Sequence, residues 1–560
     1  MTALASRVSD PSHSQTLPGF PMIRREAWPL SALVLVLALQ FTMIFTRAIN
    51  WDEFWHYSLV VQLTRGTLTQ PLQTFFVRLF QWLPLLPGAA VDHIIAARVV
   101  MFVCEVVTVA AIAALASRFT GRTVGLLCAL GYVSVAFVLQ NGFAFRADPV
   151  AAALLMSALW ILACTSFRGA WLFLFGALVG LAGIYTIKSI LYAPAFAGLA
   201  WMRWREDNCS RVFLLRCFVA AIAASACFLL LYIYHSKTGV FATTSDAKLL
   251  QHSAQKMFFV GVPRYWRSMV QFASGKVFLS ALFLLFPLAV AKIRLVPSAK
   301  VALVGLYLPI TTLAFYFNTL PYFYTFMLPP VLVACSASVA MFGRRFDPVL
   351  LTVPFLFTAA VAWIEDDPSV IDRQRQVEVA AQLIFPANIS YFDFCGMLPS
   401  FHKANAFMSE WGSELYRNGS LPPMRAEMQG EVVPLVLAVD DMFTELFQTT
   451  GPSPDFRPDD AAALRETYLH FWGPFWVAGR NISANARPMA WDVLVPGPYT
   501  VSGGEIQIGG RVIHPGEVIN LHRGTYRLSP LHGRAARLIW GSHLRVPDQP
   551  APVEPYWVGF

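Results

Sequence analysis

Residues 28–57 read WPLSALVLVLALQFTMIFTRAINWDEFWHY, an apolar run that ends in a cluster of aromatic and acidic residues. A helix needs about 20 mostly apolar residues to cross the hydrocarbon core of a membrane, and 28–46 comes close to this length. Asp52 and Glu53 follow directly, at a depth where a charge is costly and usually has a purpose. The stretch therefore predicts a membrane span that leads into a polar site at one membrane face.

Further apolar runs of this kind follow at 94–116, 123–141, 149–166, 170–186, 189–202, 212–234, 276–291, 300–318, 322–342 and 348–364. Apolar residues make up 56% of the chain and charged residues only 13%. The sequence thus predicts a polytopic α-helical membrane protein, with about eleven spans in a domain at 28–364. Lys188 interrupts the stretch 170–202, which could also be one broken span.

Basic residues occupy every second predicted loop: Arg118 and Arg122, Arg168, Arg203, Arg205 and Arg211, Lys292, Arg294 and Lys300, and Arg344 and Arg345. Cytoplasmic loops carry such an excess. The pattern predicts that residues 1–27 are a disordered cytoplasmic N-terminus and that the C-terminal domain lies outside. The net charge of +9 fits this topology and anionic lipid, and does not call for nucleic acid.

The residues that could take part in catalysis lie on the predicted outer face. Asp52 and Glu53 lie among four aromatic residues, and a carboxylate there can accept the proton of an attacking hydroxyl as a general base. The pair could equally belong to the first turn of a short interfacial helix at 54–64, where acidic residues are stabilising. Both interpretations stay open. His56 and Tyr57 are further candidates for substrate contact.

A second carboxylate, Asp148, opens the fourth predicted span from the same side, two residues after Arg146. Asp148 also precedes Pro149, which fits a helix cap. Lys188 stands between two apolar runs. It either reaches towards lipid headgroups or neutralises the phosphate of a lipid carrier.

Two later segments add basic and aromatic residues to this face. Arg264 and Arg267 lie in the basic loop 235–275. An anionic lipid-linked substrate would explain its charge, as would the translocation of long loops regardless of charge. Tyr322 and Tyr324 begin the tenth span, either in an interfacial aromatic belt or along a carrier site.

In this order the features resemble the GT-C-fold glycosyltransferases, in particular the protein O-mannosyltransferases and the lipid A aminoarabinose transferases. The resemblance spans residues 28 to about 345: Asp-Glu after the first span, Arg-x-Asp entering a later one, Lys after a Gly-rich span, and a late Tyr…Leu-Pro-Pro. It implies Asp52 as catalytic base beside Glu53, Asp148 as a second acidic residue, and Lys188 and Tyr324 at the carrier. Phe54-Trp55 stand where the aminoarabinose enzymes often have Thr-Arg, and Tyr322 where relatives often have Arg or His, which leaves the sugar open.

The resemblance implies transfer of a monosaccharide from a polyprenyl phosphate to a hydroxyl of lipid A or lipopolysaccharide, of another envelope glycan or glycolipid, or of a protein. Asp52 would take the proton, and the acceptor oxygen would displace the carrier with inversion. Lys188, Arg146 and the arginines of 235–275 would stabilise the leaving phosphate. The expected enzyme lies in the bacterial inner membrane with its C-terminal domain in the periplasm.

Two other functions would require different features in the sequence. A transporter or flippase of a lipid-linked sugar would have charges near the bilayer midplane and internal repeats, whereas these acids gather at one face. A scaffold would leave Asp52, Asp148 and Lys188 without a role. No cofactor is required by the sequence, although Asp52 and Asp148 could hold a divalent metal.

Residues 365–490 predict a mixed α/β region outside the membrane. Val432–Val439 is typical of a buried strand, and Asp440 of the start of a helix. A second helix is predicted at 461–471.

Residues 491–560 predict a small antiparallel β module, because short apolar runs alternate with Gly and Pro pairs. Gly509-Gly510 is typical of a two-residue hairpin turn. The module is either purely structural or binds an acceptor through its tryptophans.

Overall fold

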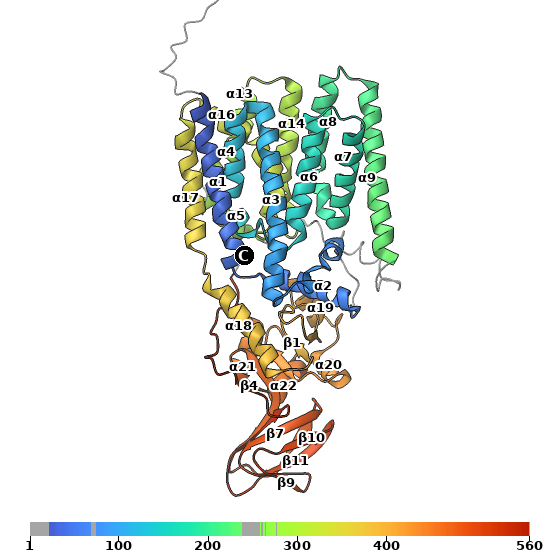
Figure 1. Ribbon diagram of the computed structural model, residues 1–560, viewed down its shortest axis with the longest axis vertical. Coiled ribbons are helices and arrows are strands. Elements are labelled where there is room, and N and C mark those ends of the chain that lie inside the picture. Colours follow the sequence, from blue (N-terminus) through green and yellow to red (C-terminus); the bar gives the residue numbers. More distant parts are fainter. Residues whose placement is uncertain are drawn as a thin grey trace, which may run out of the picture.

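The computed structural model describes residues 22–68, 74–237, 258, 261–263, 265–275 and 277–558. It consists of a bundle of long helices and a C-terminal domain of shorter helices and strands (Figure 1). Residues 1–21 and most of the loop 235–275, Arg264 included, lie outside the described residues.

Every predicted apolar run is largely helical. The bundle contains α1 (Met22–Thr46), α3 (Ala90–Thr120), α4 (Arg122–Val133), α5 (Ala136–Asn141), α6 (Ala147–Cys164), α7 (Ala170–Tyr185), α8 (Ala193–Glu206), α9 (Arg211–Lys237), α12 (Val277–Leu284), α13 (Phe286–Lys292), α14 (Pro297–Tyr307), α15 (Phe323–Ala334), α16 (Ser336–Gly343) and α17 (Pro348–Ile364). The stretch 170–202 forms two helices, α7 and α8, and Lys188 lies in the short 3-10 helix η3 (Ile187–Tyr192) between them.

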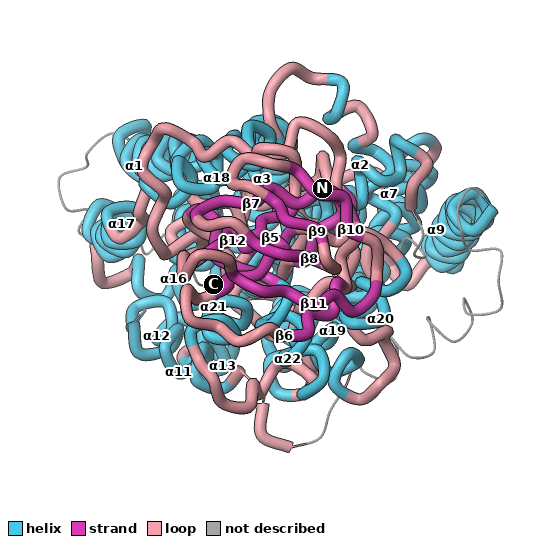
Figure 2. The backbone as a smooth tube through the Cα atoms, turned by 90° about the horizontal axis from the view of Figure 1, so that it is seen from below, coloured by secondary structure: helices cyan, strands magenta, loops and turns pink. Residues whose placement is uncertain are grey.

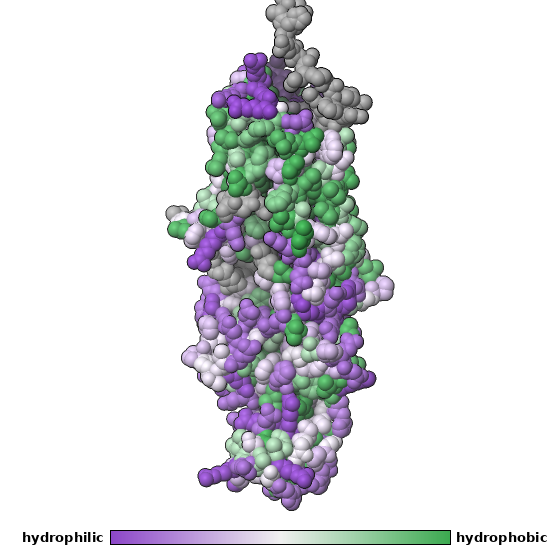
Figure 3. Space-filling view, turned by 90° about the vertical axis from the view of Figure 1, so that its left-hand side faces the viewer, coloured by the Kyte–Doolittle hydropathy of each residue, from purple (hydrophilic) through white to green (hydrophobic). Residues whose placement is uncertain are grey.

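Within the described residues, six helices are individually long and apolar enough to cross a membrane, and the pair α15–α16, bent by 50°, adds a seventh. The other predicted runs are broken into shorter helices, so the number eleven stays a prediction. Large apolar side chains such as Leu230 (69% exposed) and Phe357 (70% exposed) face outward. The face of the bundle drawn in Figure 3 is likewise largely apolar, which suits lipid. The chain is a polytopic helical membrane protein.

Helix α18 (Ser369–Ile384) leads from α17 into the C-terminal domain, whose strands lie over the centre of the bundle (Figure 2). The other helices there are α19 (Glu410–Arg417), α20 (Met424–Gly430), α21 (Asp441–Gln448) and α22 (Pro458–Thr467). The strands are β1 (Ser390–Phe392), β2 (His402–Lys403), β3 (Leu435–Leu437), β4 (Tyr468–Trp472), β5 (Phe475–Ile482), β6 (Met489–Val493), β7 (Gly497–Gly503), β8 (Ile506–Ile508), β9 (Arg511–Ile513), β10 (Val518–Leu521), β11 (Gly524–Pro530) and β12 (Ala536–Trp540).

One sheet has the order β10-β7-β12-β5-β3-β1-β2, with β4 also on β5, and a second has the order β6-β11-β8-β9. Strand β5 joins the halves of the first sheet, because Phe475–Val477 pair with β3 and Gly479–Ile482 pair with β12. The sheet therefore continues across the boundary predicted at 490/491.

Several local predictions are confirmed in this domain. Strand β3 lies within the predicted strand, and the Asp440 carboxylate accepts a hydrogen bond from Phe443 N at the start of α21. Gly509 and Gly510 have φ of 55° and 91° in the β8–β9 hairpin, which glycine tolerates. The helix predicted at 461–471 is wrong in its last third, since α22 ends at Thr467 and pairing with β5 makes the next residues a strand.

Candidate functional site

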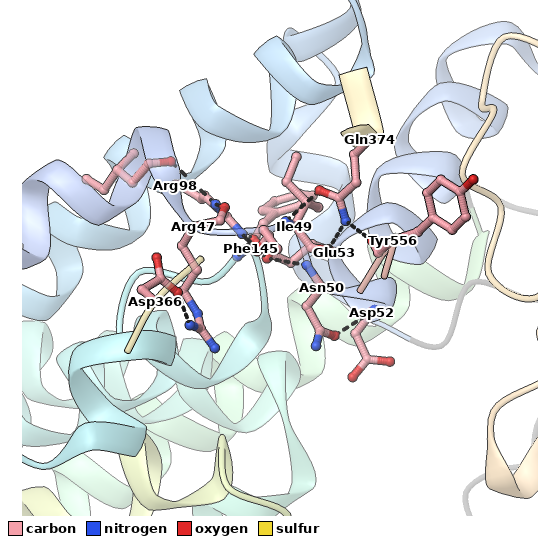
Figure 4. Close-up of polar contacts among 12 residues, drawn as sticks. Arg47, Ile49, Asn50, Asp52, Glu53, Arg98, Phe145, Asp366, Gln374 and Tyr556 are labelled. Carbon is pink, nitrogen blue, oxygen red and sulfur yellow. Dashed lines mark hydrogen bonds and ion pairs between the residues drawn. The ribbon is translucent and has the colours of Figure 1, made fainter. Parts of the chain in front are cut away.

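Helix α2 (Trp51–Arg65) begins at the acidic pair, so the interfacial helix that the sequence allowed is present. Asn50 caps it: Asn50 Oδ1 accepts from Asp52 N (2.9 Å), and Glu53 Oε1 accepts from Asn50 N (3.1 Å). This reciprocal capping box fixes the first turn. It directs Glu53 back into the protein, while Asp52 points away from it (Figure 4).

Glu53 is 1% exposed and forms a buried ion pair with Arg98 of α3. It also accepts a hydrogen bond of 2.8 Å from Phe145 N. Arg98 in turn donates to the carbonyl oxygens of Arg47 (2.8 Å) and Ala48 (2.9 Å), just after α1. Burial alone would raise the pKa of Glu53, but Arg98 and the hydrogen bonds hold this pKa below its usual range. Glu53 thus joins three segments and is not placed to contact a substrate.

Four charged side chains form an alternating line that we call the charged row: Asp52, Arg146, Asp148 and Lys188. Arg146 pairs with Asp52 and lies 3.5 Å from Asp148, and Lys188 Nζ lies 2.5 Å from Asp148 Oδ1. The two predicted carboxylates therefore share one site. Asp148 occupies the first turn of α6, whose N-cap is Arg146, so the predicted cap at Asp148 is shifted by two residues.

Exposure distinguishes the two carboxylates. The side chain of Asp52 is 18% exposed and that of Asp148 only 4%. Tyr322 packs against the row, with its ring centre 3.4 Å from the Arg146 guanidinium carbon and 5.5 Å from Lys188 Nζ. A substrate can reach Asp52 more easily, while Asp148 is enclosed between the two cations and holds them.

The remaining predicted residues divide between this site and other places. His56 lies between the rings of Phe76 (4.9 Å) and Phe145 (6.4 Å). Burial, with the charge of Arg146, lowers the pKa of His56 to about 4, so it is neutral at physiological pH. Tyr57, in contrast, is buried and hydrogen-bonded to His93 on the side of α3, which corrects its prediction as a substrate residue.

Tyr324 is also placed differently from the prediction. It is fully buried between Phe137 (5.3 Å) and Phe272 (4.8 Å). Two positions on a helix are about 200° apart around its axis, so Tyr324 faces away from the side of Tyr322. Arg267 lies on α11 (Trp266–Gly275), where its guanidinium carbon is 5.9 Å from the ring centre of Trp266, and within the described residues it does not contact the charged row.

An apolar cavity of about 650 Å³ opens beside the Lys188 end of the row. Thr186, Ile187, Ser189 and Ile190, on both sides of Lys188, belong to its wall, and the rest comes from α6, α7, α8, α9 and Phe167 in the loop between α6 and α7. A charged head and an apolar chamber thus adjoin at one turn of the chain.

A metal between Asp52 and Asp148 was an alternative in the sequence. The guanidinium of Arg146 pairs with both carboxylates and takes that place. In the part of the chain that the structure describes, no group of three or more His, Cys, Asp or Glu is arranged to hold a metal ion. These residues therefore do not fit a bound metal in this arrangement.

The family model described as dolichyl-phosphate-mannose-protein mannosyltransferase matches residues 71–232, which include Arg146, Asp148 and Lys188. No curated protein sequence matches the chain. The chain is similar in structure to ArnT from Cupriavidus metallidurans bound to undecaprenyl phosphate, with a TM-score of 0.52 and 12% identity over 77% of this chain and 96% of that one.

Apo ArnT from the same organism gives a TM-score of 0.51 and 12% identity, over 81% of this chain and 97% of that one. The apo oligosaccharyltransferase of Archaeoglobus fulgidus gives 0.45 and 11%, over 91% and 96%. The helical bundle and the likeness to ArnT show that this chain has the GT-C fold.

Proposed function

We propose that the protein is a membrane glycosyltransferase that moves a monosaccharide from a polyprenyl-phosphate carrier to an acceptor hydroxyl. The observation that carries the proposal is the junction of the charged row with the apolar cavity at Lys188. A polyprenyl phosphate has the matching chemistry, an anionic head on a long apolar chain. ArnT, which shares the fold, is described with undecaprenyl phosphate bound.

In the proposed reaction Asp52 is the base. The acceptor hydroxyl gives its proton to the Asp52 carboxylate while its oxygen bonds to the anomeric carbon. The bond from this carbon to the phosphate oxygen breaks with inversion, and polyprenyl phosphate leaves. Lys188 and Arg146 offset the charge that develops on the phosphate, and Asp148 keeps both cations in place.

Glu53 and Asp148 have separate roles in this proposal. Glu53 is a positioning residue, because its carboxylate already accepts hydrogen bonds from Arg98, Phe145 N and Asn50 N.

We further propose that the reaction takes place on the periplasmic side of a bacterial inner membrane, where glycolipids such as lipid A, other envelope glycans and proteins offer hydroxyl groups.

The full chain in lipid nanodiscs, supplied with undecaprenyl-phosphate hexoses and pentoses and an envelope extract, tests the proposal. Asp52→Asn should abolish sugar transfer while the protein stays folded, because the amide has the shape of the carboxylate and Arg146 still lies beside Asp148. Asp92→Asn is the matched control, because Asp92 is 43% exposed and pairs with Arg375 outside the row. A transporter of lipid-linked sugars would release no undecaprenyl phosphate, whether Asp52 is present or replaced. Absence of release by the unsubstituted protein would therefore overturn the proposal.

A further inference from the structure

Five partly exposed aromatic side chains join α2 to the C-terminal domain beside Asp52: Trp51, Trp55, Phe394, Phe407 and Trp557, here called the aromatic cluster. The ring centre of Trp51 lies 5.7 Å from that of Phe394 and 6.2 Å from that of Trp557. Phe407 lies 5.6 Å from Phe394 and stacks on Trp55 at 4.9 Å. The cluster is thus continuous, and one of its members precedes Asp52 in the chain.

The sheet places two of these rings. Strands β1 and β2 are parallel neighbours, and Phe394 and Phe407 follow their carboxyl ends. Ligands of open α/β sheets commonly bind at this edge. Here the edge contacts α2, because Phe394 touches Trp51 and Phe407 touches Trp55.

Buried polar contacts hold this edge rigid. The Asp393 carboxylate is 0% exposed, pairs with Lys403 at 2.8 Å and accepts hydrogen bonds from Gly396 N and Met397 N. Asn405 Nδ2 donates to Asp393 O (2.8 Å), and Met408 N donates to Phe394 O (3.0 Å). The loops that carry Phe394 and Phe407 are therefore tied to each other.

Gln374 of α18 places the third ring. Its side chain exchanges two hydrogen bonds of 2.8 Å with the backbone of Ile49, and its Nε2 also lies 2.9 Å from Tyr556 O (Figure 4). Gln374 is 0% exposed. One buried amide thus connects the segment before Asp52 with the segment that carries Trp557, and Trp557 packs on Trp51 and Phe54.

Resting on the proposed function, we propose that the aromatic cluster is the acceptor subsite and that it binds a sugar ring of a glycan or glycolipid. In-line displacement places the attacking and leaving oxygens on opposite sides of the anomeric carbon. Lys188 and the cavity mark the leaving side. The acceptor then approaches Asp52 from the C-terminal domain, where the cluster lies.

The chemistry of the cluster favours a sugar over a peptide. A pyranose ring has a face of C–H groups that packs on aromatic rings, and hydroxyls at its edge, one of which can reach Asp52. An extended peptide needs backbone partners along its length. The polar groups next to the cluster, Asp393, Lys403 and Asn405, are already bonded to one another in the described structure.

Saturation-transfer NMR on the full chain in nanodiscs, without donor, tests the subsite. The probes are methyl glycosides of glucose, galactose, mannose and arabinose and a serine- and threonine-containing pentapeptide. At least one glycoside should receive saturation at its ring C–H protons. Trp557→Ala and Phe407→Ala should weaken its binding about tenfold. Trp82→Ala, at an exposed tryptophan outside the cluster (40% exposed), should leave it unchanged.

Three results would overturn the subsite: no glycoside binds, binding is insensitive to both cluster variants, or only the pentapeptide binds. The melting temperatures of the variants show whether they fold. If Phe407→Ala does not fold, Phe407→Leu can replace it, because leucine keeps an apolar side chain and removes only the aromatic ring. The assay contains no donor, so a failure here is distinct from a failure of Asp52→Asn to abolish transfer. If transfer is measurable, cluster variants should raise the KM for acceptor and leave that for donor unchanged.

Discussion

Arg98 Nε lies 2.8 Å from Glu53 Oε2, and Arg98 Nη2 lies 2.5 Å from Glu53 Oε1, in an ion pair that is almost completely buried. Glu53 also accepts a hydrogen bond from Phe145 N. The chain neighbours of these two residues, Asp52 before Glu53 and Arg146 after Phe145, form the first pair of the charged row. The buried pair therefore sets the register of the catalytic residues that we propose.

Removal of one partner of this pair should be strongly destabilising. Glu53→Ala leaves Arg98 as an uncompensated buried charge, so we expect a loss of about 3–5 kcal/mol in the free energy of unfolding. Thermal unfolding of the detergent-solubilised chain measures it. Glu206→Ala is the control, since its pair with Arg118 is partly exposed (38% and 29%) and should contribute about 1 kcal/mol or less. Equal losses in both variants would contradict the positioning role.

Lys188 should contribute to binding of the carrier head. Lys188→Ala removes the cation that ends the charged row beside the cavity, so we expect affinity for undecaprenyl phosphate to fall about tenfold or more. Binding to nanodisc-embedded protein can be followed with fluorescently labelled undecaprenyl phosphate. Lys292→Ala, an exposed lysine at the end of α13, should bind as the wild type does. Unchanged affinity for Lys188→Ala would contradict the assignment.

The cavity should distinguish lipid carriers by the length of their prenyl chain. Ala197 belongs to its wall and is exposed, so Ala197→Phe can fill space without disturbing the packed core. We expect weaker binding of undecaprenyl phosphate and little change for a two-isoprene analogue that is too short to reach Ala197. Competition between the two carriers measures this difference. A uniform loss for both would show that the substitution acts on the head site instead.

Asp440 should make stability depend on pH. Burial raises the pKa of this carboxyl to about 7 in the folded protein, above about 3.9 in an unfolded chain. Its stabilising contribution is therefore present at low pH and is lost as the pH rises through about 7. Asp440→Asn keeps the helix cap without the charge.

The melting temperature of Asp440→Asn should exceed that of the wild type increasingly between about pH 5 and about pH 8. A pH series of thermal unfolding on the full chain measures the difference. A gap that stays constant across this range would show that Asp440 does not titrate there.

The amino-acid sequence predicts the local features of this fold well. The first span and the polar turn after it follow from one stretch, because apolar length and helix capping are local properties. Asp148 and Lys188 could be placed on the same face as Asp52 from the alternation of basic loops. Their arrangement around Arg146 could not, since it depends on how α6 and η3 pack against α2.

The missed residues are those whose partners are distant in sequence. Arg98 lies at the start of a predicted span, where a buried arginine signals an acidic partner, but nothing in the sequence pointed to Glu53. No local sequence motif marks Gln374 or Trp557. They come to lie beside Ile49 and Trp51 only when the chain folds. The strand at Tyr468–Trp472 was missed because pairing with β5 overrides its helix-like pattern.

The first sheet has a mechanical consequence. Its strands run without interruption from β10, far from the bundle in Figure 1, to β2, whose following loop carries Phe407 against Trp55. The β10 edge is therefore connected to the loop beside Trp55 by an unbroken series of paired strands. A molecule bound at the β10 end of this sheet would be held at a set distance from the helical bundle.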